Sequence, residues 1–477
     1  LYLDKLQSLG DFPIVLTALP DDKETLVEAS KRQPRYKVAQ QILDDLDKAL
    51  GLLMESAPGG KNRISRDAAL LLRSRAALFE ATWEKWHYAK EKNKPEKFYD
   101  TELGEAELMA KIDNYLDQSI AAAEEVRQRG VWKIYNTGNV ENDYRSIFET
   151  PDLTANPEIL WFKMYDGDQV GNSVTRYLNT GGGNVGVTAS LVDDYLTIDG
   201  RPLVGKELLD AKRVYPTELL PTVRDPRLSQ TVALPGQRMQ PAGAGNPYVV
   251  GFPSLAGDGS AFGTNMTGYV MLKHVQIDYT GDYISEYKGS TPAIQFRYAD
   301  VLLNYAEALA EKNGAANAGK IIEILHPLRE RAGMPDIDFD REYNTSAEYP
   351  FRNLDKYIQA VRRERRVEKA LEGRRVFDIM RWAAAEELII GNRAHGALFI
   401  GSNLPEQYGP ELKYDQASGN NMFLSGSPDD AERYILPVPP STMPNGWQFK
   451  PNRDYLLPIQ ERMINVMDGM WEQNPGW

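Results

Sequence analysis

The sequence has no cysteine among its 477 residues and only four histidines. Without cysteine the chain has no disulfide framework, no thiolate nucleophile and no cysteine-ligated metal site. The histidines fall in unrelated segments, without the paired spacing of a metal site: His87, His274, His326 and His395. No apolar run approaches the roughly 20 residues that a membrane-spanning helix needs. We therefore expect no metal site from histidine or cysteine, and no transmembrane helix.

Positive charge is also in short supply. The chain carries 55 lysine and arginine residues against 68 aspartate and glutamate residues, a formal net charge of −13. This balance disfavours non-specific binding to nucleic acid or to an anionic membrane surface. Polyanionic ligands are disfavoured as well, except at a local basic patch. We therefore expect no nucleic-acid partner.

Sequence signatures of catalysis and of metal or cofactor binding are missing too. No Gly-x-Ser-x-Gly nucleophile motif occurs. Asp336, Asp338 and Asp340 resemble the start of a calcium loop, but Arg341 stands where that loop needs a glycine, and Ala347 stands where it needs a bidentate glutamate. We assign no catalytic residue, no cofactor and no metal ligand.

Helical periodicity is what the sequence does contain. Apolar side chains recur at three- and four-residue steps over 36–54, 65–86 and 111–129. Ser65 is a suitable N-cap for the second of these helices. The segment 136–291 loses this periodicity and is dense in Gly, Pro, Asn and Thr, so we expect long loops and short strands there, with a short helix near 191–196.

The segment 296–314 carries another helical stripe and organises the second half of the chain. Three small residues at 306, 308 and 310 allow a second helix to approach closely, and Asn313-Gly314 is expected to end the first helix with a left-handed residue. A second apolar stripe follows over 318–333. The two together span about the length of one tetratricopeptide unit. A longer helix or a helix pair is expected over 354–382.

The helix at 361–382 is rich in arginine and could be either a polyanion-binding patch or a structural ion-pair network. Three intrahelical pairings are available at helical spacing, namely Arg365 with Glu368, Glu372 with Arg375, and Arg374 with Asp378. We therefore favour a structural network.

Three ordered motifs resemble the SusD/RagB family of outer-membrane nutrient-binding lipoproteins. They are RYADVLLNYAEAL at 297–309, RRERRVEKALEGRRVFDIMRW at 362–382, and the terminal YLLPI with QNPGW at 455–459 and 473–477. GDFP at 10–13, VRDPRL at 223–228 and LVDDYLTIDG at 191–200 also look like family signatures. Taken in this order, the motifs span most of the chain.

The resemblance implies a mostly α fold, in which tetratricopeptide-like helix pairs form a SusD-like α-α superhelix beside a large irregular region of loops and short strands. We expect one domain over 1–477: N-terminal helix pairs over 1–135, a loop-rich ligand face over 136–291, further helix pairs over 292–400, and extended C-terminal segments over 401–477.

The resemblance also implies a function. Family members bind glycans or other nutrients without catalysis and deliver them to a SusC-like TonB-dependent transporter. They sit on the outer leaflet of the outer membrane through a lipidated N-terminal cysteine. This chain has no such cysteine, so we expect the signal peptide and the anchor to lie upstream of Leu1.

Aromatic residues are the candidate ligand contacts, because the apolar face of a pyranose stacks on a ring. Trp83 and Trp86 lie near the end of a predicted helix, but they also continue its core stripe, so core packing is a serious alternative. Tyr248, Phe252 and Phe262 lie in Gly-rich loops, where members of the resembled family often place stacking residues, although ordinary loop packing is also open for them. Of the two groups, we favour the loop residues.

Two functions of other classes stay open at this point. One is a secreted α/α-barrel glycoside hydrolase, since such barrels share the size, acidity and aromatic content of this chain. The other is a tetratricopeptide-type adaptor that binds only proteins. The ordered motifs favour the glycan-binding protein over both.

Overall fold

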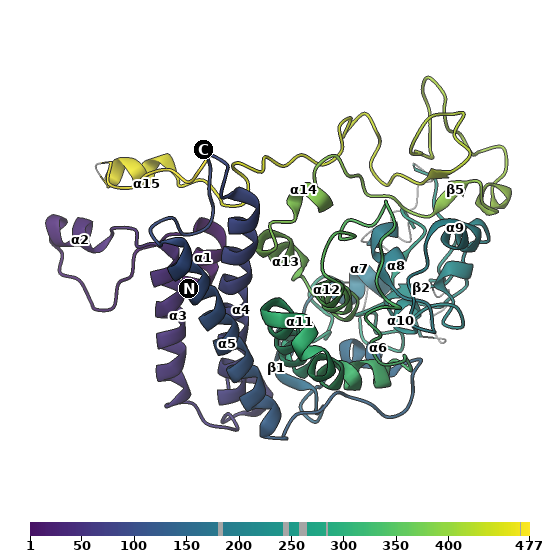
Figure 1. Cartoon of the computed structure of the whole chain (residues 1–477). Helices are drawn as coiled ribbons and strands as arrows, with labels where there is room; N and C mark the ends of the chain where they lie inside the picture. The colour runs from purple at the N-terminus through teal and green to yellow at the C-terminus, as the bar shows by residue number, and fades with distance from the viewer. Residues whose placement is uncertain (180–184, 242–247, 257–264, 283–284, 468) are drawn as a thin grey trace.

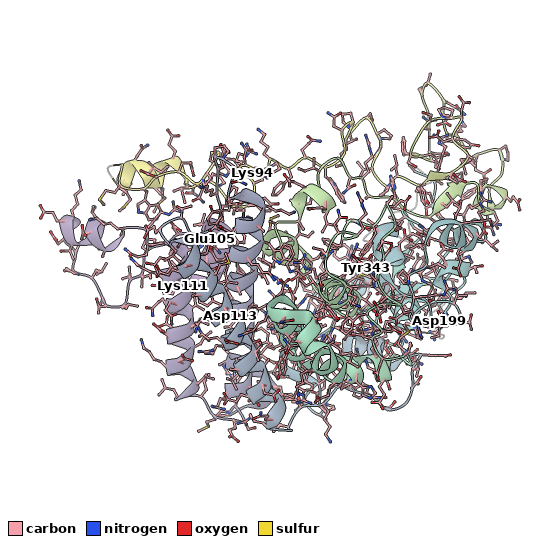
Figure 2. The ribbon with its side chains drawn as sticks, viewed as in Figure 1. Lys94, Glu105, Lys111, Asp113, Asp199 and Tyr343 are labelled. Atoms are coloured by element: carbon pink, nitrogen blue, oxygen red, sulfur yellow. The ribbon has the colours of Figure 1, made fainter. Side chains whose placement is uncertain are left out.

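The structure is a computed structural model, and it describes residues 1–179, 185–241, 248–256, 265–282, 285–467 and 469–477. Long helices pack side by side in one part of the molecule, and short helices, short strands and irregular segments make up the other (Figure 1). Glu105, Lys111 and Asp113 lie along the helical part, whereas Asp199 lies on the opposite side of the molecule, in the irregular part (Figure 2). The prediction of a mostly helical protein is confirmed.

The helical part is built from the N-terminal third of the chain. Its elements are α1 Tyr2–Leu9, α2 Lys23–Ala29, α3 Arg35–Leu50, the 3-10 helix η1 Gly60–Asn62, α4 Arg66–Glu91 and α5 Glu105–Gln128. Ser65 caps α4 as predicted, because its hydroxyl accepts the N–H of Ala68 at 3.4 Å. Helix α5 begins earlier than predicted, because the buried Leu108, one turn before Ile112, already belongs to its apolar stripe.

The helix α11, Tyr298–Arg331, anchors the core of the molecule. It packs against α4, α5 and α12, Lys356–Glu368, with Leu302, Leu325 and Val361 fully buried between them. The predicted pair of helices is present, but the left-handed end between them is wrong. Asn313 breaks the helix with an extended backbone, φ −166° and ψ 88°, and the second helix follows at once without a loop.

Gly314 explains why the chain needs a glycine at this break. A Cβ built at Gly314 would lie 2.4 Å from the Cβ of Tyr357, the second residue of α12. Such a contact is far inside van der Waals distance, so any side chain here would push α12 away. The glycine therefore serves close packing of two helices and not a positive φ.

The middle of the chain contains more short helices than its composition predicts. These elements are α6 Asp143–Glu149, β1 Ile159–Lys163, α7 Val174–Asn179, α8 Ala189–Asp194, α9 Gly205–Arg213, η2 Thr217–Leu219, α10 Arg227–Thr231, β2 Val232–Ala233, β3 Val270–Met271 and β4 Ala293–Arg297. β1 pairs antiparallel with β4, and β2 pairs antiparallel with β3. The predicted short helix near 191–196 is α8. These helices escaped prediction because most of them are under two turns, too short to show a periodic stripe.

The C-terminal part completes the molecule with α13 Arg375–Arg381, α14 Ala385–Leu388, β5 Leu398–Ile400, η3 Leu404–Gln407, β6 Arg433–Tyr434 and α15 Glu461–Val466. The yellow end of the chain crosses back over the helical part to α15, so both termini lie on that side (Figure 1). Among the helices that the structure describes, none is both long and apolar enough to cross a membrane.

The arginine-rich helices form a structural network, as favoured from the sequence, but the predicted intrahelical partners are wrong. Arg365 pairs with Glu307 of α11, and Glu372 pairs with Arg297 and Lys273. Glu368 meets Arg297 at 2.6 Å and two further arginines of other segments. The ion pairs therefore tie separate elements together, which sequence spacing within one helix does not reveal.

Candidate functional site

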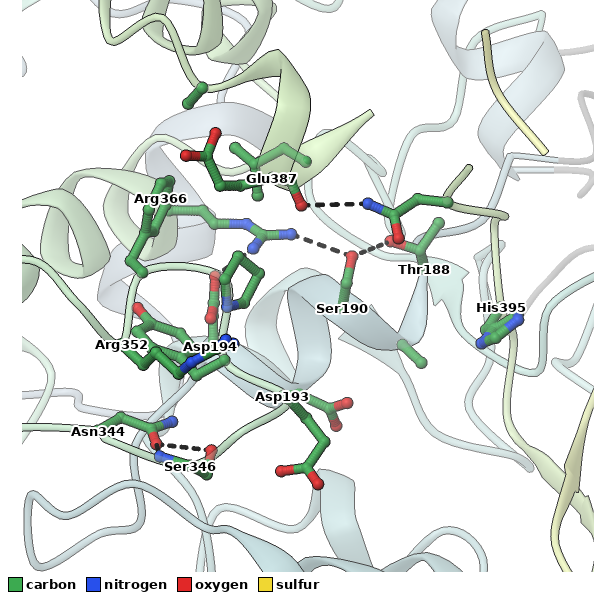
Figure 3. A pocket seen from close by; sticks show the side chains of 18 of the residues that line it. Thr188, Ser190, Asp193, Asp194, Asn344, Ser346, Arg352, Arg366, Glu387 and His395 are labelled. Carbon is green, nitrogen blue, oxygen red and sulfur yellow. Dashed lines mark hydrogen bonds and ion pairs between the residues drawn. The ribbon is translucent and has the colours of Figure 1, made fainter. Parts of the chain in front are cut away.

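A cavity of about 1240 Å³ lies where the long helices meet the irregular part of the chain. The end of α4, α12, α13 and the segment 344–354 form one side, while α8, α9 and C-terminal segments form the other. This volume exceeds the roughly 300–1,000 Å³ of typical small-molecule pockets. The cavity is therefore large enough for an elongated ligand, and we refer to it below as the central cavity (Figure 3).

One wall of the central cavity is a guanidinium held between two indole rings. The guanidinium carbon of Arg362 lies 4.4 Å from the ring centroid of Trp86 and 4.2 Å from that of Trp382. Glu311 fixes this arrangement, because it accepts hydrogen bonds from Arg362 Nη2 at 3.1 Å and from Trp86 Nε1 at 3.1 Å. Although burial opposes ionisation, Lys85 and Arg362 hold the pKa of Glu311 below its ordinary value. The wall is therefore rigid and charged.

The opposite wall presents an aromatic pair. The rings of His395 and Tyr434 stack with centroids 5.5 Å apart and planes within 6°. Lys212 approaches the Tyr434 ring at 5.2 Å and donates to Asp193 at 2.7 Å. Burial, reinforced by Lys212 and Arg393, lowers the pKa of His395, so its imidazole is neutral at pH 7. Trp447, which also lines the cavity, keeps 39% of its surface exposed.

Helix α8 supplies a polar edge. Ser190, Asp193 and Asp194 are spaced three and four residues apart, which places them on one face of the helix. Arg366 of α12 pairs with Asp194 and also donates to Ser190 Oγ at 3.2 Å. Ser190 lies between Arg366 and Thr188 in the cavity, with Thr188 Oγ1 at 2.9 Å (Figure 3).

The chemistry of this arrangement suits binding. Aromatic faces alternate with hydroxyls and charged donors, the combination that holds polyhydroxylated ligands. Three of the five lining carboxylates are paired with lining cations: Asp193 with Lys212, Asp194 with Arg366, and Glu387 with Lys90. Within the described residues, no group of three or more histidine, aspartate or glutamate side chains is placed to hold a metal ion.

The two predicted tryptophans have different surroundings. Trp83 is fully buried, and its indole N–H donates to the carbonyl oxygen of Phe98 at 2.7 Å. Its ring stacks on His87 at 4.2 Å, so it packs in the core, the alternative that its helical stripe left open. Trp86 is half-buried and lines the central cavity. A ligand in the cavity can reach Trp86 but not Trp83.

Of the predicted loop residues, Tyr248 and Phe252 do not line this cavity. Tyr248 is half-buried against an apolar cluster that includes Met239 and Val250. Phe252 is 39% exposed, and its ring centroid lies 6.3 Å from that of Tyr215. Phe262 lies outside the described residues. The binding roles of all five predicted aromatics stay predictions.

Sequence reasoning missed Tyr434 and Trp447 as lining residues of the cavity. Both belong to C-terminal segments without helical periodicity, which we expected only to lie across the scaffold. The signal available for Trp447 was a large ring in the Pro-, Asn- and Gly-rich stretch 444–447, where no stripe assigns it to a core. Tyr434 stands beside an apolar run that gave no sign of a ligand contact. Its ring partner, His395, is 39 positions away in the sequence, so no local pattern pointed to the pair.

Comparison with known proteins adds the family. A model of the SusD family matches residues 157–477. Solved structures that share the fold include a SusD-like carbohydrate-binding protein from Bacteroides fragilis, with 20% identity, a TM-score of 0.66, and coverage of 98% of this chain and 76% of that chain. A structure determined with a xylogluco-oligosaccharide has 18% identity, a TM-score of 0.55, and coverage of 100% and 79%.

A laminarin-binding SusD-like protein also shares the fold, with 17% identity, a TM-score of 0.50, and coverage of 100% of this chain and 76% of that chain. No curated protein matches the sequence. The family model spans more than half of the chain and includes the three motifs that carry the resemblance. The chain therefore belongs to the SusD family, whose members are non-catalytic binding proteins.

Proposed function

We propose that this protein captures an oligosaccharide in the central cavity. The observation that carries the proposal is the cavity itself, about 1240 Å³ in volume and lined by aromatic rings beside hydroxyl and charged side chains. Similar structures are described as carbohydrate-binding, laminarin-binding or determined with a xylogluco-oligosaccharide, which supports a carbohydrate ligand for this chain.

Each wall has a part in this proposal. The exposed indole of Trp447 and the accessible part of Trp86 stack on the apolar faces of sugar rings. On α8, the Ser190 hydroxyl donates and accepts hydrogen bonds with sugar hydroxyls, and the carboxylates of Asp193 and Asp194 accept them. Because α8 and α12 are held together by the pair between Arg366 and Asp194, these groups are positioned before the ligand arrives, which lowers the entropic cost of binding.

The proposal extends to delivery. The captured oligosaccharide passes to a SusC-like TonB-dependent transporter, with the protein held on the outer leaflet of the outer membrane by an N-terminal lipid anchor. Membership of the SusD family supports this partner and location. Affinity purification of the lipid-anchored protein from outer membranes is expected to recover a TonB-dependent barrel in stoichiometric amount. Repeated recovery without such a barrel would count against delivery.

The binding experiment is a panel of neutral and acidic oligosaccharides titrated by calorimetry. For a ligand that binds, Trp447→Ala is expected to weaken affinity about five- to 150-fold, the effect of losing a well-placed ring worth about 1–3 kcal/mol. The matched control is Trp477→Ala, because Trp477 has a similar exposure of 44% but does not line the cavity. Equal losses in both variants would exclude a specific role for the cavity.

The loop prediction and the two alternative functions are tested with the same samples. Phe252→Ala leaves affinity unchanged if the cavity is the site, whereas a large loss would move the site to the loops. Release of reducing sugars from the bound oligosaccharide would support the glycoside hydrolase. Binding of proteins without binding of any oligosaccharide would support the adaptor.

A further inference from the structure

The central cavity is positively charged in a negatively charged protein. Seven lysine and arginine side chains line it against five aspartate and glutamate side chains. The whole chain, by contrast, carries a net charge of −13. An excess of cations is therefore concentrated at one concave site, where low-dielectric walls strengthen its attraction for anions.

Ion pairs within the cavity already neutralise most of its carboxylates. Three of the lining carboxylates are engaged by lining cations, Lys212, Arg366 and Lys90. Glu432, a fourth, pairs with Arg213 outside the cavity lining. The acidic lining is therefore largely neutralised before any ligand binds.

Three lining arginines have no carboxylate partner among the residues that the structure describes. Arg352 donates to the carbonyl oxygen of Ala347 at 2.6 Å, and Arg393 donates to that of Pro444. The guanidinium of Arg375 lies 5.3 Å from the ring centroid of Trp382. Carbonyl and ring contacts leave a full positive charge on each guanidinium.

Arg375 is the most informative of the three. Its Nη1 is shielded from solvent and has no hydrogen-bond partner within the described part of the chain. Burial, reinforced by the nearby cation of Arg366, lowers the pKa of Arg375 to about 10, so the group is still charged at neutral pH. A buried charged group without a carboxylate partner is costly, and an oxyanion bound beside this guanidinium would offset that cost.

We propose that the ligand of the central cavity is an anionic oligosaccharide, one that bears carboxylate or sulfate groups received by Arg375, Arg352 and Arg393. The inference rests on the proposed function and names its substrate class. Arginine suits this role because its planar fork of N–H donors matches the two oxygens of a carboxylate or sulfate.

The test compares acidic oligosaccharides with forms of the same backbone whose charge has been removed. One arm uses uronate-containing oligosaccharides and their methyl esters, and the other uses sulfated oligosaccharides and their desulfated forms. At least one acidic form is expected to bind tenfold or more tightly than its neutral counterpart, with affinity falling as salt rises from 50 to 500 mM. The arm that responds identifies the anion.

The outcomes separate the two proposals. If neutral forms bind in the cavity as tightly as acidic forms, the anionic class is overturned while oligosaccharide capture stands. If neither form binds in either arm and the neutral panel fails as well, oligosaccharide capture falls too. Acidic binding that is unaffected by Trp447→Ala and by the arginine variants below would place the anion elsewhere and overturn the inference.

Two arginine variants and one control complete the design. Arg375→Gln and Arg352→Gln are each expected to weaken the acidic ligand about tenfold, and to weaken it more than the neutral form of the same backbone. Arg352 is exposed, so its variant tests the inference even if Arg375→Gln folds poorly. Arg63→Gln removes the same charge from an exposed site outside the cavity lining and is expected to change affinity less than twofold. Equal effects of Arg63→Gln and Arg352→Gln would contradict a local role.

Discussion

Glu368 joins three arginines of the buried ion-pair network. Its carboxylate contacts Arg297 at 2.6 Å and Arg227 at 3.0 Å, and it also pairs with Arg331. Although burial opposes ionisation, these arginines hold the pKa of Glu368 well below its ordinary value. One side chain of α12 thus joins the strand β4, the end of α11 and the start of α10.

Removing the Glu368 carboxylate is expected to destabilise the protein strongly. Glu368→Gln leaves three buried guanidiniums without their shared counter-charge, so the free energy of unfolding should fall by about 3–5 kcal/mol. The matched control is Glu207→Gln, which breaks an exposed pair with Arg201 and should cost less than about 1 kcal/mol. Urea denaturation of both variants measures the difference. A Glu368→Gln protein as stable as the control would refute a central role for the network.

Asp300 gives the network a pH dependence. Burial raises the pKa of this carboxyl, but Lys369 and Arg75 outweigh that effect and lower the pKa to about 2, from an ordinary value of 3.8. Because the folded pKa is below the unfolded one, the stabilisation is fully present above about pH 4 and is lost as the pH falls through 2. It amounts to about 2 kcal/mol at neutral pH.

The check is a comparison of Asp300→Asn with the unmodified protein at several pH values. The variant should be less stable than the unmodified protein at pH 6. At pH 3 the difference in unfolding free energy should be smaller by about 1 kcal/mol, because the stabilisation contributed by the Asp300 carboxyl is partly lost at that pH. Denaturant titrations at pH 6, 4.5 and 3 measure this. A gap that stays constant or widens toward pH 3 would mean that Asp300 is not held ionised in the folded state.

At the scale of elements, the break in α11 depends on one close approach. Gly314→Ala introduces a Cβ 2.4 Å from Tyr357 Cβ and should destabilise the protein by about 1–3 kcal/mol through overpacking. Gly319→Ala is the control, because a Cβ there meets no atom within 4 Å and alanine favours a helix, so stability should rise by about 0.5–1 kcal/mol. Thermal unfolding of the two variants measures opposite shifts; shifts of the same sign would show that the contact with Tyr357 is not limiting.

The elements that sequence could predict are those with long periodic stripes. α3, α4 and α11 were located because their apolar residues recur over several turns, and Ser65 marked the start of α4. The pairing partners could not be predicted, because Arg365 of α12 meets Glu307 of α11, a residue 58 positions earlier in the chain. Spacing along one helix predicted Glu368 as the partner of Arg365, but in the structure Glu368 pairs with other arginines.

The candidate site was predictable only in part for the same reason. Trp86 and Trp83 lie three residues apart, yet one lines the central cavity and the other is buried, since the end of α4 turns one edge toward the cavity. The cavity takes its other walls from α8, α12 and the segment near Trp447. A site assembled from segments separated by hundreds of residues leaves no local pattern in the sequence.

At the scale of the whole molecule, the fold divides support from binding. The long helices and the buried ion-pair network form one side of the molecule, and the irregular part closes a cavity against it. The sequence motifs that predicted the family lie in α11, α12 and the C-terminal segment. All three lie within the region that the family model matches. We propose that this cavity is where the oligosaccharide binds.

The most direct test of that claim is a crystal structure of the protein with the tightest oligosaccharide from the panel. We expect electron density for the sugar in the central cavity, with a ring against Trp447 and its polar groups within hydrogen-bond distance of Ser190 or the lining arginines. Density over Phe252 and Tyr248, with the cavity free of sugar, would contradict the account and place the binding site on the loops.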